Sequence, residues 1–577
     1  MSGHDPLALA EWQRIRRYAV PERMIAECAE ARERGDWRAA CAAGRIDLAE
    51  DAAGLAMHLA PDLLRWHLPR ALGGVTTLAV DRRYVLVPGE GTIAADTVVA
   101  TVQAPASMFG SQRLALGAAR WGEIDLGQAH LLPAYLWDAR YAGDLRAAVG
   151  GSTLRVPGFG ADGLPAESLG SGGDTPSRAE RSRLSETFAG SFAEAGFEVA
   201  DDCPEAPWPR FDRRAFIRTA DPMRLLHDLR LFARRFGFDT WALWADYHRY
   251  LQFSVDGDDV RVVWRSIVGS RSAEARELPR VYPDVARHQV DLDLVRAGRL
   301  TPADVHPLVR AALFPAGMSG PSPVPAAGAV VGFPVGSVVG PSPVPVAGAV
   351  VGFPAGSVAG PSAVLASGAA PVAADDGPIR VRCRGDWHEV DVRLGRLDLL
   401  AHPEAERRRE RALSAFGGAV SGCFAAAKAW HGAPGRLPRR LRAHREDLWQ
   451  RMIHGGTRTV LELLDAGMDP QLRDGRGGTL LHRLRAFDHG RLLPRLLAEG
   501  LDVNARDKEG STPLYLSVVH RWPADLIIAL VDSGADPYLP DRDGMSVIDH
   551  CEDYLDYRDD LDSDFEAAIA YLRRRTR

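Results

Sequence analysis

The sequence predicts a multidomain protein with α+β blocks in its N-terminal half and an all-α repeat solenoid at its C-terminal end. Three observations lead to this fold class. Short β-type runs alternate with helical stretches before residue 313. An uncharged segment that repeats every 20 residues follows, and residues 445–577 hold landmarks that recur at spacings of 33 and 34 residues.

Length and composition set the class of protein. A chain of 577 residues is too long for one hydrophobic core, and its net charge of −6 argues against a globally basic nucleic-acid binder. Only Lys428 and Lys508 are lysines among 70 basic residues, a bias toward arginine that is typical of GC-rich bacterial genomes. The six cysteines form no CxxC pair and no apolar signal segment follows Met1, so we expect a reduced, cytoplasmic protein.

Residues 1–155 predict the first α+β block. Helix formers dominate up to Leu64, and β-type runs then predict a small antiparallel sheet, with strands over 76–80, 83–87, 97–103 and 112–116. A helix is expected over 134–148. Residues 156–183 are rich in Gly, Ser and Pro, which indicates a linker.

Residues 184–312 predict a second α+β block. A helix is expected over 223–235, followed by strands over 240–244, 250–255 and 260–264. Asp256-Gly257-Asp258 is a hairpin turn signal between the last two strands.

Residues 313–376 form the uncharged repeat segment apart from Asp375 and Asp376. The run Gly-Pro-Ser-Pro-Val-Pro begins at Gly320 and again at Gly340. Prolines interrupt every unit, so the segment does not fit a membrane-spanning helix. We expect a mobile tether that lets the two halves of the chain move independently.

Residues 377–444 predict a hairpin and basic helices that cap the repeats. The basic run Arg436–Arg445 has two interpretations. It could contact an acidic partner or nucleic acid, or it could be the solvated face of a helix.

The repeat region, residues 445–577, has a fixed set of landmarks. They are Gly467, Gly500 and Gly534; Asp474, Asp507 and Asp541; and Gly477, Gly510 and Gly544. The first three glycines, Gly467, Gly500 and Gly534, each follow a helical apolar run, where the chain must leave the helix with a positive φ. Thr479 and Thr512 stand at helix starts as capping residues, and Pro513 takes a first-turn position.

These segments resemble the ankyrin-repeat family. Ser511-Thr512-Pro513-Leu514 is near the family's TPLH motif with Tyr515 in place of His, and Thr479-Leu480-Leu481-His482 keeps the His. The resemblance implies three to four units of paired antiparallel helices, a partner-binding groove, and a structural His482 that bonds to the backbone.

The sequence shows no HExxH, no P-loop and no Cys/His ligand spacing, so we expect no catalytic residue, no cofactor and no metal. We predict a scaffold that binds a protein partner through its repeats, with no nucleic acid and no membrane. The alternative is an enzyme or effector with its activity in the first 310 residues, targeted or regulated by the repeats. The predicted partner-binding residues lie on turn tips or near first helices: Arg476, Arg483, Lys508, Tyr515, Trp522 and Arg542.

Overall fold

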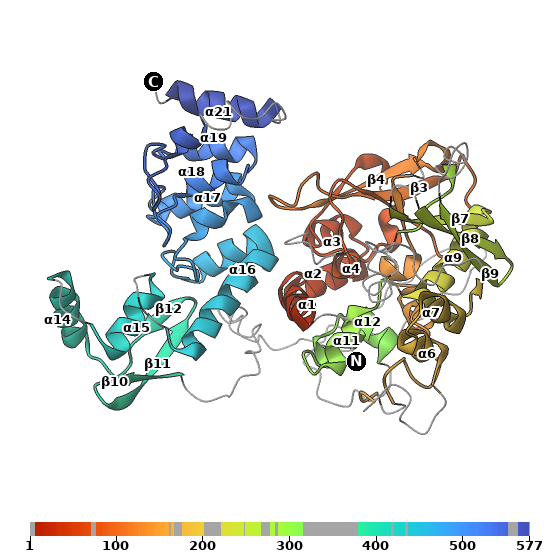
Figure 1. Cartoon of the computed structure of the whole chain (residues 1–577), viewed down its shortest axis with the longest axis horizontal. Helices are drawn as coiled ribbons and strands as arrows, with labels where there is room; N and C mark the ends of the chain where they lie inside the picture. The colour runs from red at the N-terminus through yellow and green to blue at the C-terminus, as the bar shows by residue number, and fades with distance from the viewer. Residues whose placement is uncertain are drawn as a thin grey trace, which may run out of the picture.

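The computed structural model describes two halves of the chain, shown from red to green and from teal to blue in Figure 1. The described residues are 6–52, 54–70, 77–125, 127–160, 163–166, 176–200, 221–246, 249–266, 277–282, 287–314, 379–416, 420–432, 435, 437–551 and 563–575. The expected tether lies outside them apart from residues 313 and 314. None of the described helices is long and apolar enough to cross a membrane.

The N-terminal half begins with four helices and a five-stranded sheet. The helices are α1 (Pro6–Tyr18), α2 (Glu22–Glu33), α3 (Trp37–Ala43) and α4 (Pro61–His67). The strands are β1 (Ile46–Leu48), β2 (Arg83–Leu86), β3 (Val98–Gln103), β4 (Leu114–Arg120) and β5 (Ala129–Leu132), in the order β1-β4-β3-β2-β5.

The expectation of a purely antiparallel first sheet is wrong. β3 runs antiparallel to both of its neighbours, but β1 pairs with β4 and β5 pairs with β2 in parallel. Parallel neighbours need long crossover connections, which a reading of adjacent strands does not reveal. Residues 77–80 form no strand, and the helix expected over 134–148 is three short turns: η4 (Ala134–Leu136), η5 (Ala142–Asp144) and α5 (Leu145–Ala148).

A second sheet has the order β6-β9-β8-β7. Its strands are β6 (Glu198–Val199), β7 (Thr240–Asp246), β8 (Arg249–Asp256) and β9 (Asp259–Ser266), so the three predicted strands are confirmed. The helices around it are α6 (Arg178–Leu184), α7 (Phe188–Ala195) and α9 (Pro222–Phe236), and α11 (Val290–Arg296) and α12 (Pro307–Leu313) follow.

The two expected N-terminal blocks share the first sheet. Leu86 and Val102 on one face belong to a core that also includes α1, α11 and α12. Val85 and Val99 on the other face belong to a core with α7, α9 and the second sheet. The boundaries at residues 155 and 184 therefore do not separate two independent cores.

The linker expected over 156–183 contributes to the fold at both of its described ends. Val156 and Phe159 are buried, and the Phe159 ring lies 5.2 Å from that of Phe314. The buried Glu180 of α6 binds Arg155 Nη1 at 2.6 Å and accepts from the backbone N–H of Gly158 at 2.8 Å. The described ends of this segment are therefore packed into the N-terminal half.

The C-terminal half has a three-stranded sheet followed by helices. The strands are β10 (Ile379–Cys383), β11 (Asp386–Arg393) and β12 (Arg396–Asp398). The helices are α14 (Glu404–Ala415), α15 (Gly422–Trp430), α16 (Arg439–Asp465), η8 (Leu480–Ala486), α17 (His489–Ala498), α18 (Pro513–Val519), α19 (Ala524–Asp532) and α21 (Ser563–Arg575). From η8 to α19 short helices pack in successive pairs (Figure 1). One apolar core extends from Val381 to Leu572.

The N-terminal half contacts α16 at a break in that helix. Gly456 has a φ of +76°, so the helical hydrogen-bond ladder stops there and the carbonyls of Ile453 and Gly455 are left for other donors. Arg70 Nη1 donates to the Ile453 carbonyl at 3.2 Å, and Arg45 Nη2 donates to the Gly455 carbonyl. A Cβ on residue 456 would lie 2.2 Å from Arg70 Nη1, so glycine is required for this approach.

Ion pairs extend the contact along α16. Arg458 binds both carboxylate oxygens of Glu27, at 2.8 and 3.0 Å. His454 Nε2 lies 3.1 Å from the carboxylate of Glu11, and that hydrogen bond lowers the pKa of Glu11. The expectation that the two halves move independently is therefore wrong for this structure, in which α1 and α2 lie against α16.

We expect the two halves to stay together after the chain is cut. A protease site inserted between residues 315 and 378 should give two fragments that co-elute in size-exclusion chromatography at micromolar concentration. Replacing Arg45 and Arg70 with Ala removes charge-assisted hydrogen bonds worth about 1.5–3 kcal/mol each, so these fragments should separate. Arg34→Ala is the control, because Arg34, the residue after α2, pairs with Glu30 of that helix and with no described residue of the other half. Separation of the unmutated fragments would contradict the docking.

Candidate functional site

An aspartate shapes each of three turn tips in the C-terminal half. Asp474 Oδ1 accepts from the backbone N–H groups of Arg476 at 2.8 Å and Gly478 at 2.9 Å. Asp507 and Asp541 make the same pair of bonds to the residues two and four positions later. An aspartate that bonds the following backbone fixes a turn. The regularly spaced aspartates of the sequence are therefore the residues that fold the tips.

Successive tips are joined by backbone hydrogen bonds. The N–H of Lys508 donates to the carbonyl of Arg476 at 3.0 Å, and the N–H of Arg542 donates to that of Glu509 at 2.9 Å. A Cβ on Gly510, which has a φ of +81°, would lie 2.9 Å from the Arg542 nitrogen. The tips therefore form a continuous edge, because glycine permits the close approach.

The structural landmarks lie at helix ends. Gly467, Gly500 and Gly534 have φ values of +90°, +81° and +89° after α16, α17 and α19. Thr512 caps α18 by accepting from the N–H of Tyr515 at 3.1 Å, and Pro513 occupies the first helical position.

Thr479 and His482 cap η8 together. His482 Nδ1 accepts from the N–H of Thr479 at 3.0 Å, and Nε2 lies 3.1 Å from the carbonyl oxygen of Ser511. These contacts require the neutral imidazole with its proton on Nε2. Burial lowers the pKa of His482, which keeps the ring in that form.

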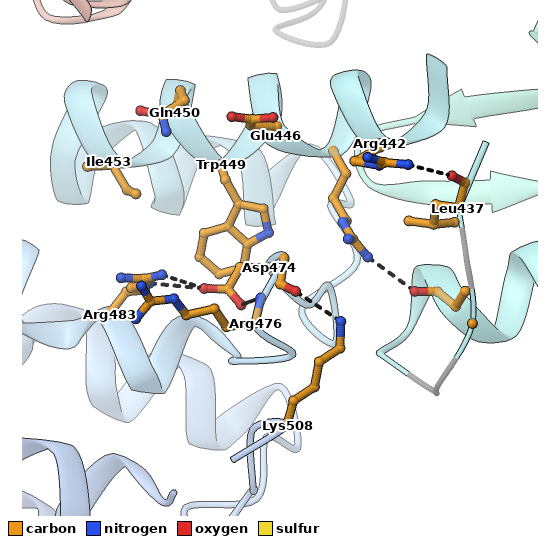
Figure 2. Close-up of a pocket in the computed structure, with 14 residues that line it drawn as sticks. Leu437, Arg442, Glu446, Trp449, Gln450, Ile453, Asp474, Arg476, Arg483 and Lys508 are labelled. Atoms are coloured by element: carbon orange, nitrogen blue, oxygen red, sulfur yellow. Dashed lines mark hydrogen bonds and ion pairs between the residues drawn. The ribbon is translucent and has the colours of Figure 1, made fainter. Parts of the chain in front are cut away.

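A pocket of about 550 Å³ lies between α16 and the first two tips (Figure 2). Trp449 projects from α16 into its centre and is itself buried. Arg445, also on α16, is held by the carbonyl of Ala429 at 3.1 Å. The complete lining is Ala429, Gly435, Leu437, Arg442, Arg445, Glu446, Trp449, Gln450, Ile453, Asp474, Gly475, Arg476, Arg483 and Lys508.

The pocket has an excess of positive charge. Five of its lining side chains are basic and two are carboxylates. Asp474 is already bound by Arg483, at 3.1 and 2.7 Å, so it offers little negative charge to a ligand. Arg476 and Lys508 are exposed at the rim, and Lys508 Nζ donates to the carbonyl of Gly475 at 2.9 Å. The site is thus suited to an anionic group.

The structure brings Arg476, Arg483 and Lys508 together in this pocket. Tyr515 lies on a neighbouring unit, where its hydroxyl donates to Asp541 at 2.6 Å, and Arg542 is exposed on the third tip. Trp522 does not project: it is only 2% exposed and belongs to the core, so it is corrected from a binding residue to a packing residue.

Sequence reasoning missed the contribution of α16. Arg442 and Arg445 fall in the basic run, whose solvated-face interpretation fails for Arg445 because this residue is buried. Nothing in the sequence near Trp449, Gln450 and Ile453 predicts that they line a pocket. The other wall of the pocket consists of tips that are 20 or more residues away in the sequence. Sequence reasoning also missed that Cys383, His388, His402 and Cys423 converge, because their spacing in the sequence matches no ligand motif.

Comparisons with known proteins give a partial match to the ankyrin-repeat class. Part of the chain, 99 residues, is 33% identical to a protein described as ankyrin repeat-containing, from Schizosaccharomyces pombe. The match covers 17% of this chain and 46% of that protein, so the chain spans less than half of the relative's length. No family model matches the chain.

His482 is expected to make stability depend on pH. In the unfolded chain His482 takes up a proton near its ordinary pKa of 6.5, whereas in the folded chain its pKa is lower. The stabilisation by neutral His482 is therefore complete above pH 6.5 and is lost as the pH falls below it. His482→Gln should lower the free energy of unfolding by about 1–2 kcal/mol at pH 7.5 and by less at about pH 5.5, measured by urea titration.

His431→Gln is the control for this measurement, because His431 lies outside η8 and its side chain is 48% exposed. Its effect on the unfolding free energy should be small at both pH values. An effect of His482→Gln that does not change with pH would contradict the neutral-imidazole arrangement.

Proposed function

We propose that this protein is a non-catalytic interaction protein whose C-terminal helix pairs, in residues 445–577, are three to four ankyrin repeats. The repeats and α16 bind an acidic segment of a partner protein. The observation that carries the proposal is the basic pocket, whose lining includes Arg442, Arg476, Lys508 and Trp449. The partial match to an ankyrin repeat-containing protein supports the class.

The chemistry of the pocket indicates the kind of partner. Arginine and tryptophan side chains that meet in one depression are the residue types that dominate protein–protein binding energies. Arg476 and Lys508 extend from adjacent tips that are fixed to each other through their backbones, so both charges reach a ligand without reordering of the main chain. A short segment with aspartate or glutamate side chains would satisfy them.

The rival function, an enzyme or effector in the first 310 residues, gains no support from two buried acid–histidine pairs in that part of the chain. His306 Nε2 lies 3.0 Å from Asp62, and His288 Nδ1 lies 3.4 Å from Asp221. All four side chains are buried. These pairs are therefore positioned to hold the N-terminal cores together rather than to meet a substrate.

A cytoplasmic location fits the same proposal. The five described cysteines, Cys28, Cys41, Cys383, Cys423 and Cys551, form no disulfide among themselves. Buried free thiols are usual where the surroundings are reducing.

We expect the full-length protein to bind acidic peptides in preference to neutral or basic peptides of the same length. Fluorescence anisotropy with labelled peptides measures the affinity, which should fall as salt is added because the contact is electrostatic. The double variant Arg476→Glu/Lys508→Glu should bind at least about tenfold more weakly.

The matched control is Arg491→Glu/Arg574→Glu, which makes the same charge change at exposed positions on α17 and α21. It should leave the affinity unchanged. Equal binding by both double variants, or no preference for acidic peptides, would overturn the proposed site.

A further inference from the structure

Two cysteines and two histidines converge in the segment before α16. Cys383 ends β10, His388 lies in β11, His402 precedes α14 and Cys423 is in the first turn of α15. One ligand atom from each, sulfur or ring nitrogen, lies within 4.8 Å of all the others. Cys383 is 1% exposed, His402 3% and Cys423 0%, so the cluster is closed to solvent on most sides.

The ligand atoms are close enough to share one ion after small shifts: the nitrogen–sulfur distance matches a zinc site, and the distance between the two nitrogens is shorter. His388 Nδ1 lies 2.9 Å from His402 Nε2 and 3.8 Å from Cys423 Sγ. Bonds of about 2.0–2.1 Å to nitrogen and 2.3 Å to sulfur place the ligand atoms of a tetrahedral zinc roughly 3.3–3.8 Å apart. A hydrogen bond between the two imidazoles would account for the nitrogens alone. It would not explain why both sulfurs face the same point.

The β10–β11 hairpin places two of the ligands, Cys383 and His388, on the same face. Arg384 and Gly385 both have positive φ, 52° and 102°, as a two-residue turn between β10 and β11 requires. His388 pairs with Val381, so Cys383, two residues further along β10, lies on the same face of the hairpin as His388.

The surroundings orient His402 for coordination. Its Nδ1 lies 3.0 Å from Glu406 Oε2, which leaves Nε2 as the atom that faces the cluster. Arg384 Nη1 holds the other oxygen of Glu406 at 3.1 Å, and the Phe424 ring packs 4.6 Å from that of His402. A carboxylate behind a ligating histidine fixes its tautomer and ring orientation.

Gly422 allows the fourth ligand to approach. Its φ is +58°, and a Cβ at this position would lie 2.5 Å from Cys383 Sγ. Because there is no side chain here, the start of α15 can bring Cys423 next to Cys383.

We propose that Cys383, His388, His402 and Cys423 form a structural site for one Zn²⁺ ion. Two thiolates and two imidazoles in a tetrahedral arrangement are a donor set that Zn²⁺ prefers, and four protein ligands leave no open position for a substrate. Binding releases the two thiol protons to solvent. The ion would join four elements: β10, β11, α15 and the loop that precedes α14. The partner-binding proposal does not depend on this site.

The site is tested on the tag-free, full-length protein. Elemental analysis by mass spectrometry should find one zinc per chain, and Cys383→Ser and His402→Ala should lose it. Cys551→Ser and His431→Gln are matched controls that should retain it, because neither residue belongs to the cluster: Cys551 is buried in the C-terminal core and His431 follows α15. Less than stoichiometric zinc in the unmutated protein after incubation with ZnCl₂ and dialysis would overturn the proposal.

Two further measurements do not depend on whether the ligand variants fold. Co²⁺ bound to the unmutated protein should show thiolate charge-transfer absorption and the visible bands of a tetrahedral ion. Glu406→Gln keeps all four ligands, and its zinc affinity, measured against a chromophoric chelator, should fall about 10–100-fold. An octahedral Co²⁺ spectrum, or a Cys383–Cys423 disulfide in the protein isolated under reducing conditions, would contradict the site.

Discussion

The arrangement of the two halves depends on one contact: the guanidinium groups of Arg45 and Arg70 bind carbonyls at the end of a helix. Gly456 stops the first part of α16, and the carbonyls left at that end carry the negative pole of the helix dipole. Arg45 and Arg70 come from the N-terminal half to bind them, and Arg70 also donates to the carbonyl of Ala486 at the end of η8. The part of α16 before Gly456 also supplies one wall of the basic pocket, so the docking contact and the binding site share this helical segment.

This contact is specific because the buried guanidinium groups and the free carbonyls are each unfavourable without the other. Burial lowers the pKa of the Arg70 guanidinium to about 9, which shows how unfavourable the site would be for a charge without partners. The carbonyl oxygens would in turn lack donors if the arginine were removed. Planar guanidinium groups reach several oxygens at once, and lysine could not replace that geometry. The scarcity of lysine in this chain is thus compatible with its internal contacts.

The sequence was informative where structure is local. The spaced aspartates, the glycines with positive φ and the threonine caps each act within a few residues of themselves, and a single sequence records them. It was uninformative where partners are distant. Nothing near Arg70 indicates Ile453, and nothing near Trp522 indicates that it is buried rather than exposed. The four converging Cys and His residues were missed for the same reason, since each comes from a separate element and no short ligand spacing results.

The docked halves belong to one chain, and residues 315–378 connect them covalently. Covalent connection makes their association intramolecular, with an effective concentration that reaches the millimolar range when a linker spans the two sites without strain. A surface of guanidinium–carbonyl and carboxylate contacts can therefore remain closed without the large apolar area that two separate proteins would need. Any outside molecule that competes for α16 would have to overcome this local concentration as well as the contacts themselves.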